Sequence, residues 1–273
     1  MGSNAASAPL RMAILMADTP LPKTAATYGT YGGVFIDLFR RAVAPSGASL
    51  ESVLAITTHD VVADGFESAY PDLAHVDVVL ITGSKHTAFD NTPWIQALVA
   101  FTQRTLATTT PEAMAAGVHP VRMLGICFGH QIIGRALGAP VTKGAKGWEV
   151  SVTDVALSPE GAAFFGSELR AADHGRLAIQ QMHRDIVVEY PAGAVPLAST
   201  DVCAVQGMLL PGRAVTVQGH PEFTGPIVRE ILEARHAMGV LSDDVYQKGI
   251  DVVDDKHDGE AIARAFLKFA QGA

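Results

Sequence analysis

Short runs of consecutive hydrophobic residues alternate with segments of helical periodicity through the first half of the chain. Three runs are apolar at nearly every position, as in parallel strands that are covered on both faces: residues 11–17, 77–83 and 121–126. Residues 50–56 alternate between apolar and polar positions and predict another strand. Apolar positions at helical spacing predict helices over 34–43 and 94–106, with a polar loop over 21–33. The repeated order of strand, loop and helix indicates an α/β fold.

After Gly138 the pattern changes to an alternation with period two, which is typical of antiparallel strands. Such strands are predicted over residues 140–147 and 148–157. Further strands, without an assigned direction, are predicted over 177–182, 186–189, 195–198, 204–209 and 214–218. Amphipathic helices are predicted over 227–238 and 262–269, with a weaker one over 243–253. The sheet is therefore expected to be mixed, with antiparallel strands added to the parallel ones.

The composition favours one domain with a large hydrophobic core. The chain has 273 residues, of which 48% are hydrophobic and 18% are charged. We expect a single domain over 11–273, after a disordered tail at 1–10. A net charge of −8, from 20 basic and 28 acidic residues, disfavours binding to nucleic acid or to anionic membranes. No apolar run approaches the roughly 20 residues that a membrane-spanning helix needs.

The two cysteines, Cys127 and Cys203, are too few for a disulfide framework or a four-thiolate zinc site. This count suits a reducing compartment, so we predict a cytoplasmic protein without a metal or another cofactor. Cys203 is expected to be an inert packing residue.

Residues 121–138 combine a strand, a sharp turn and a helix around Cys127. The strand ends in Gly125-Ile-Cys127-Phe-Gly129, and apolar residues then recur at helical spacing up to Gly138. Glycines on both sides let the backbone reverse within a few residues, as in a nucleophile elbow. The free N–H groups that begin the helix favour a thiolate and offer a donor to a developing oxyanion. Cys127 is thus a candidate nucleophile, and a buried cysteine in a glycine-rich turn is the alternative.

A cysteine nucleophile needs a base, and that base needs an acidic group to orient it. His220 is the strongest candidate, because a predicted strand leads directly into His220-Pro-Glu222. In extended backbone His220 and Glu222 project to the same side, so the carboxylate can hold one imidazole nitrogen while the other faces the thiol. The same pair could supply two metal ligands, but no third ligand is evident.

Three further polar residues lie close to these motifs. His130 follows Cys127 by about one helical turn and could be the base, but packing or hydrogen bonding at the turn is the favoured interpretation. Gln131 is better placed to reach a ligand beside Cys127. His183 interrupts a strand pattern, where it can expose backbone groups for recognition.

Three motifs in this order resemble those of the class I glutamine amidotransferases: Gly83-Ser84 after a strand, Gly125-Ile-Cys-Phe-Gly-His-Gln131, and His220-Pro-Glu222 after a late strand. The resemblance implies a flavodoxin-like fold. A mostly parallel central sheet would carry helices on both faces, here with a smaller antiparallel extension.

The resemblance also implies a role for each of these residues. Cys127 would be the nucleophile, His220 the base and Glu222 the carboxylate that orients it. The oxyanion hole would be formed by backbone N–H groups, and the glutamyl ends would be held by side chains and backbone nearby. The residues concerned are Gly83 and Phe128 for the oxyanion hole, and Ser84, Gln131, Met182 and His183 for the substrate.

Members of this family release ammonia from glutamine through a glutamyl thioester, and most pass it to a synthetase domain. No such domain is evident here, so the chain is similar to the stand-alone, guanylate-synthetase-like branch, which includes gamma-glutamyl peptidases. The favoured hypothesis is a hydrolase of a small-molecule γ-glutamyl amide, whether a peptide, a conjugate or glutamine. One alternative is a glutaminase subunit that donates ammonia to a separate synthetase partner. Another is a non-catalytic binding protein that kept the pocket.

Overall fold

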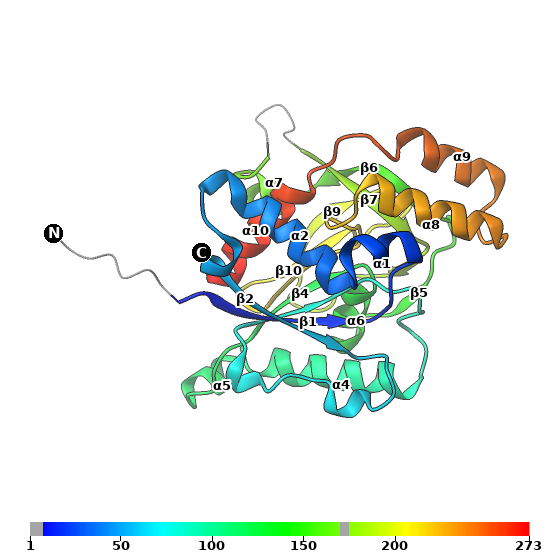
Figure 1. The fold of residues 1–273 in the computed structure, drawn as a ribbon. Coiled ribbons are helices and arrows are strands. Elements are labelled where there is room, and N and C mark those ends of the chain that lie inside the picture. The colour runs from blue at the N-terminus through cyan, green and yellow to red at the C-terminus, as the bar shows by residue number, and fades with distance from the viewer. Residues whose placement is uncertain (1–7, 170–174, 273) are drawn as a thin grey trace.

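The computed structural model describes residues 8–169 and 175–272, and within these residues nine strands form one sheet in the order β2-β1-β3-β4-β11-β10-β9-β6-β7 (Figure 1). The first five strands are parallel: β2 (Leu54–Asp60), β1 (Leu10–Met16), β3 (Val78–Ile81), β4 (Arg122–Ile126) and β11 (Ala214–Val217). The other four pair antiparallel: β10 (Gly207–Leu210), β9 (Val195–Ser199), β6 (Glu149–Leu157) and β7 (Arg176–His183). A separate antiparallel pair consists of β5 (Val141–Lys143) and β8 (Asp185–Val187).

Helices cover both faces of the parallel part of the sheet (Figure 1). One face carries α2 (Tyr31–Val43) and α10 (Gly259–Gln271), and the other carries α4 (Pro93–Ala107) and α6 (Phe128–Ala136). Beside the antiparallel strands, α8 (Gly225–Ala237) packs against α1 (Pro22–Tyr28) and α9 (Asp243–Val252). The remaining helices are short: α3 (Leu50–Val53), α5 (Pro111–Ala115) and α7 (Pro159–Phe165). The predicted fold, a mostly parallel sheet with an antiparallel extension, is confirmed.

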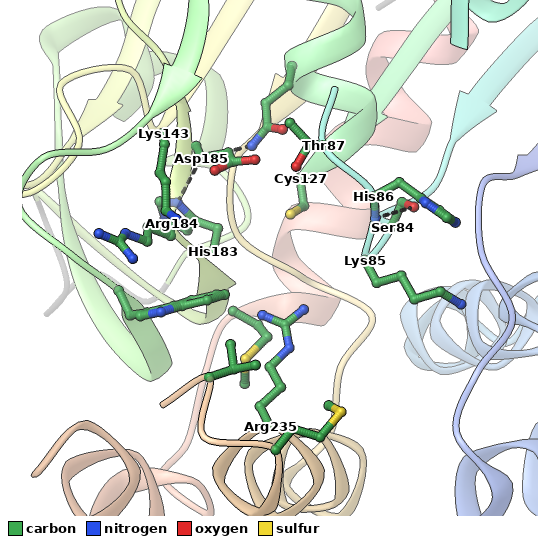
Figure 2. A pocket seen from close by; sticks show the side chains of 15 residues that line it. Ser84, Lys85, His86, Thr87, Cys127, Lys143, His183, Arg184, Asp185 and Arg235 are labelled. Atoms are coloured by element: carbon green, nitrogen blue, oxygen red, sulfur yellow. Dashed lines mark hydrogen bonds between the residues drawn. The ribbon is translucent and has the colours of Figure 1, made fainter. Parts of the chain in front are cut away.

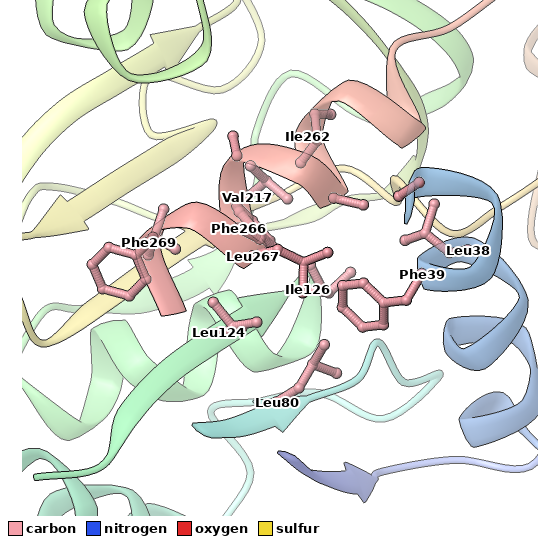
Figure 3. Close-up of a cluster of buried hydrophobic side chains, with 14 of the residues drawn as sticks. Leu38, Phe39, Leu80, Leu124, Ile126, Val217, Ile262, Phe266, Leu267 and Phe269 are labelled. Carbon is pink, nitrogen blue, oxygen red and sulfur yellow. The ribbon is translucent and has the colours of Figure 1, made fainter. Parts of the chain in front are cut away.

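Alternate residues of the parallel strands enter two separate hydrophobic cores. In β1, Met12 and Ile14 pack under α2 and α10, whereas Ala13 and Leu15 pack on the opposite face with α4 and α6. Figure 3 shows the first core, where side chains of α2 and α10 meet above β4. Because both faces are buried, the strands have to be apolar at every position, which explains their continuous hydrophobic runs.

Several segments differ from their predicted structure. Residues 144–147 and 204–206, predicted as strand, lie outside the strands. Residues 50–53 were predicted as strand but form α3, because the Ser49 hydroxyl accepts a hydrogen bond from the N–H of Ser52 and caps a helical turn. The predicted loop over 21–33 contains α1 and the start of α2. The carboxylate of Glu230 accepts hydrogen bonds from the N–H groups of Lys23 and Thr24 and so caps α1 from a helix about 200 residues away.

At the ends of the chain, residues 1–7 of the predicted tail lie outside the described residues, and β1 begins at Leu10. Among the described residues, no helix has both the length and the apolar character needed to cross a membrane.

The close contact between α6 and β3 gives a first testable prediction. A Cβ atom at Gly129 would lie 2.3 Å from the carbonyl oxygen of Ile81, so Gly129→Ala has to push α6 away from the sheet. We expect this overpacking to lower the free energy of unfolding by about 2–3 kcal/mol. Urea denaturation measures the change.

Gly193→Ala is the matched control for that substitution. Gly193 has φ 79° and nothing within 4 Å of an added Cβ, so only backbone strain of about 1 kcal/mol is expected. Equal losses for the two variants would contradict the packing argument.

Candidate active site

Three neighbouring parallel strands, β3, β4 and β11, end at the same edge of the sheet. The registers Ile81–Gly125 and Ile126–Val217 align these ends. Gly83 therefore follows β3, Cys127 follows β4 and His220 follows β11 within one small region. Open α/β sheets bind ligands beyond the carboxyl ends of such strands.

Cys127 lies in a strained turn between β4 and α6. Its φ of 50° and ψ of −101° are unusual for a residue with a side chain, and strain of this kind typically costs about 1–3 kcal/mol. The backbone is held on both sides, because the Cys127 N–H donates to the Val217 carbonyl and its own carbonyl accepts from the Gln131 N–H. Hydrogen bonds thus fix the turn, and the sulfur borders a cavity of about 520 Å³.

His220 joins Cys127 to Glu222. Its Nδ1 lies 2.8 Å from Oε1 of Glu222, and its ring also makes a side-chain hydrogen bond with Cys127. Burial alone would lower the pKa of the His220 imidazole, but the charges of Glu222 and Cys127 reverse this effect and raise it to about 10. The ring of Phe223 stacks on the imidazole at 4.0 Å and 2°, which fixes its plane.

The backbone N–H groups of Gly83 and Phe128 flank this arrangement. Neither donates a hydrogen bond within residues 8–169 and 175–272. Gly83 also packs directly against the catalytic candidate His220, because an added Cβ would lie 2.5 Å from Cε1 of that imidazole. Two free donors beside a candidate nucleophile match the requirement of an oxyanion hole.

Figure 2 shows the cavity in front of Cys127, with side chains from several distant segments around it. All four residues predicted to bind substrate line it: Ser84, Gln131, Met182 and His183. Met182 and His183 lie at the end of β7 and reach the cavity from there. A backbone bridge between Gln180 and His220 holds β7 next to the segment that follows β11. The structure therefore gathers every residue that the sequence predicted for the site.

The side chain of His183 is held inside the protein. Its Nε2 lies 3.1 Å from Oε2 of Glu149, and its Nδ1 lies 3.2 Å from the Asp185 carbonyl oxygen. Glu149 also accepts a hydrogen bond from Gln206, so the pair belongs to a buried polar chain. The ring is almost fully buried beside Glu149, so the backbone of this segment is the part better placed to contact a ligand.

His130 and Cys203 have the packing roles that were favoured for them. His130 is fully buried, with Nδ1 2.7 Å from the Thr216 hydroxyl, and burial lowers its pKa to about 3. A group that stays neutral and points away from solvent is poorly suited to act as the base. Cys203 is also fully buried, and burial raises the pKa of its thiol to about 12.

The cavity lining also contains residues that were not among the predicted site residues, including the basic residues Lys143, Arg184 and Arg235. Arg235 lies in the last turn of α8, where a cation is common on any helix, so its position gave no functional signal. Lys143 and Arg184 lie in β5 and between β7 and β8, where their side-chain direction depends on the fold. Among the described residues, no group of three or more His, Cys, Asp or Glu side chains could hold a metal ion.

Comparisons with known proteins agree with this geometry. The family model "Glutamine amidotransferase class-I" matches residues 101–234. A glutamine amidotransferase-like protein of Schizosaccharomyces pombe is 32% identical over 94% of this chain and 97% of its own length. Gamma-glutamyl peptidase 3 of Arabidopsis thaliana is 28% identical over 94% of this chain and 96% of its own length.

Among solved structures, a glutamine amidotransferase from Thermotoga maritima shares the fold, with a TM-score of 0.67 and 17% identity over 96% of this chain and 98% of that one. The fold is therefore that of the glutamine amidotransferases. By its sequence relatives, this chain belongs to the class I glutamine amidotransferase family.

The hydrogen bond between His220 and Cys127 gives a prediction for thiol reactivity. A free cysteine is alkylated about 50-fold more slowly at pH 6.5 than at pH 8.5, because its pKa is about 8.5. The His220 imidazolium persists up to about pH 10, so we expect alkylation of Cys127 to fall less than about 5-fold over this interval. Iodoacetamide labelling followed by mass spectrometry measures both rates.

Cys203 is the internal control, since it should remain unlabelled in the folded protein. His220→Ala should restore the steep pH dependence of a free thiol. If Cys127 in the unaltered protein already behaves like a free thiol, the two side chains do not form an ion pair.

Proposed function

We propose that this protein is a cysteine hydrolase that cleaves the amide bond of γ-glutamyl peptides, γ-glutamyl conjugates or glutamine. The observation that carries this proposal is the contact of Cys127 with a His220 imidazole that Glu222 orients, beside two free N–H donors. Relatives named gamma-glutamyl peptidase support the substrate class. The reaction needs a reduced thiol, which is consistent with the predicted cytoplasmic location.

In the first half of the reaction the Cys127 thiolate attacks the γ-carbonyl carbon. Negative charge moves to the carbonyl oxygen, where the N–H groups of Gly83 and Phe128 stabilise it. The C–N bond then breaks, His220 gives its proton to the leaving nitrogen, and a glutamyl thioester remains. Glu222 keeps the imidazole in the orientation that this transfer needs and stabilises its positive charge.

In the second half water attacks the thioester. His220 accepts a proton from this water, the C–S bond breaks, and Cys127 leaves as a thiolate. The sum is one γ-glutamyl amide and one water converted to glutamate and a free amine. The same proton-carrying group serves both halves, first as acid and then as base.

The hydrogen bonds of Gln131 suggest which end of the glutamyl group it binds. Its Nε2 already donates to the Asp185 carbonyl and to Oε1 of Gln218, so its own carbonyl oxygen is the group left for a ligand. An acceptor suits the α-ammonium group. Lys143 and Arg184 line the same cavity and supply positive charge for the α-carboxylate.

Release of glutamate tests the proposal. We expect glutamate from at least one of glutamine, glutathione and γ-glutamyl dipeptides. Cys127→Ala should abolish turnover while binding is kept. Glu222→Gln should lower kcat by about 10- to 1000-fold, because the imidazole loses both its orientation and its charge partner. If no substrate yields glutamate, with or without a co-purified synthetase, the proposal is wrong.

Gln131→Ala tests the assignment of the glutamyl end. If its carbonyl binds the ammonium equally in the ground and transition states, KM should rise by about 10-fold or more while kcat changes little. Gln103→Ala is the control, because Gln103 is exposed and donates only to the Ala136 carbonyl. A fall in kcat at unchanged KM would argue against this role.

A further inference from the structure

Two adjoining cavities border the candidate catalytic residues, one at Cys127 and the other at His220. The larger, of about 520 Å³, is lined by Cys127, Gln131 and Asp185. The smaller, of about 130 Å³, is lined by His220 together with Leu21 and Tyr31. Both share the wall formed by Ser84, Lys85, Met182, Arg235 and Met238.

If the proposed function holds, the positions of Cys127 and His220 determine which half of the substrate lies in which cavity. The acyl carbon has to bond to Cys127, so the glutamyl half occupies the larger cavity. The leaving nitrogen has to receive a proton from His220, so the group attached to it extends toward the smaller cavity. The smaller cavity is thus the place for the leaving half of a γ-glutamyl substrate.

Arg235 is the charged group of this second cavity that has no partner. Within residues 8–169 and 175–272 its guanidinium makes no ion pair and no hydrogen bond. The other basic residue in the lining, Lys85, lies 2.7 Å from the Asp18 carboxylate, and its backbone N–H donates to the same carboxylate. The Lys85 ammonium is therefore paired directly with Asp18, whereas no carboxylate is in direct contact with the guanidinium of Arg235 in the described part of the chain.

The guanidinium of Arg235 is also fixed in place before any ligand binds. It lies over the ring of Trp148, 4.8 Å from the centroid, and Figure 2 shows its side chain rising from α8 toward Cys127. Glu230 ties the same helix to α1 through three hydrogen bonds. A stacked, planar guanidinium on an anchored helix offers two parallel N–H donors, the geometry that binds a carboxylate.

We propose that Arg235 binds the carboxylate of the leaving half, so that the enzyme selects γ-glutamyl peptides with a free C-terminal carboxylate over glutamine and neutral γ-glutamyl amides. Lys143 and Arg184 line the larger cavity but not the smaller one and serve the α-carboxylate, whereas Arg235 lines both cavities and is the residue that can reach the second anion. The apolar part of the lining, Leu21, Ile231 and Met238, accommodates a small amino acid or dipeptide. Arg235 is a specificity residue and takes no part in the bond-breaking steps.

The test compares substrates that differ only in this charge. Glutathione and γ-glutamylglycine are paired with their C-terminal amides, and kcat/KM is measured by glutamate release. We expect the unaltered enzyme to prefer each acid by about 10- to 100-fold, the range of a charge-assisted hydrogen bond. Arg235→Gln should reduce this preference to less than about 3-fold, while kcat/KM for the amides stays nearly unchanged. Arg235→Lys should restore part of the preference.

Arg229→Gln is the matched control. Arg229 lies on the same helix, but it points to the surface and pairs with Asp254 at 2.5 Å. Its removal changes the net charge of α8 equally and should leave the preference for the acid intact. Thermal melts of all variants check that α8 remains folded.

Each outcome separates this inference from the proposed function. Equal rates for acid and amide in the unaltered enzyme would overturn the inference and leave the hydrolase intact, and this measurement needs no variant. Equal slowing of acid and amide in Arg235→Gln would also overturn it, because Arg235 would then act on the glutamyl half or on the thiolate. No glutamate from any substrate, including glutamine, would overturn the proposed function itself and the inference with it.

Discussion

The parallel pairing of β4 with β3 on one side and β11 on the other is the constraint on which the rest of the structure depends. Parallel strands end at one edge, so segments that are 44 and 93 residues from Cys127 along the chain arrive beside it. A shift of β11 by one residue would turn Val217 out of its core and rotate His220 away from the sulfur. The buried alternation of side chains into two cores makes such a shift costly, and the site geometry thus follows from packing.

Two glycines allow close contacts that place further groups of the candidate site. Gly129 lets α6 lie against β3, and Gly83 lets the His220 ring occupy the space where a side chain would otherwise be. The same approach brings the two free N–H groups near the sulfur. Burial then strengthens every charge interaction between Cys127, His220 and Glu222, because little water competes for these groups.

The sequence predicted those parts of the fold and site that depend on local pattern. Continuous apolar runs marked β1, β3 and β4, and the motifs around Cys127 and His220 marked residues that the structure brings together. Prediction was wrong for α1 and α3. The cap of α1 is the carboxylate of Glu230 in α8, which no local pattern reveals. The cap of α3 is a single serine, Ser49, and the residues after it alternate between apolar and polar positions as in a strand. Ser158 caps α7 in a similar way, because its hydroxyl accepts a hydrogen bond from the N–H of Gly161.

Arg235 shows why substrate selectivity is harder to predict than the reactive groups. The nucleophile and its base need particular residue types in particular turns, so chemistry constrains the sequence around them. An arginine near the end of an amphipathic helix is common and has many uses. Three features of the structure distinguish it from a surface charge: its guanidinium lies over Trp148, Lys85 pairs with Asp18, and Arg235 lines both the cavity at Cys127 and the cavity at His220. A planar guanidinium without a hydrogen-bonded carboxylate can bind an anion in a bidentate manner, and under the proposed function that anion would be the carboxylate of the leaving half.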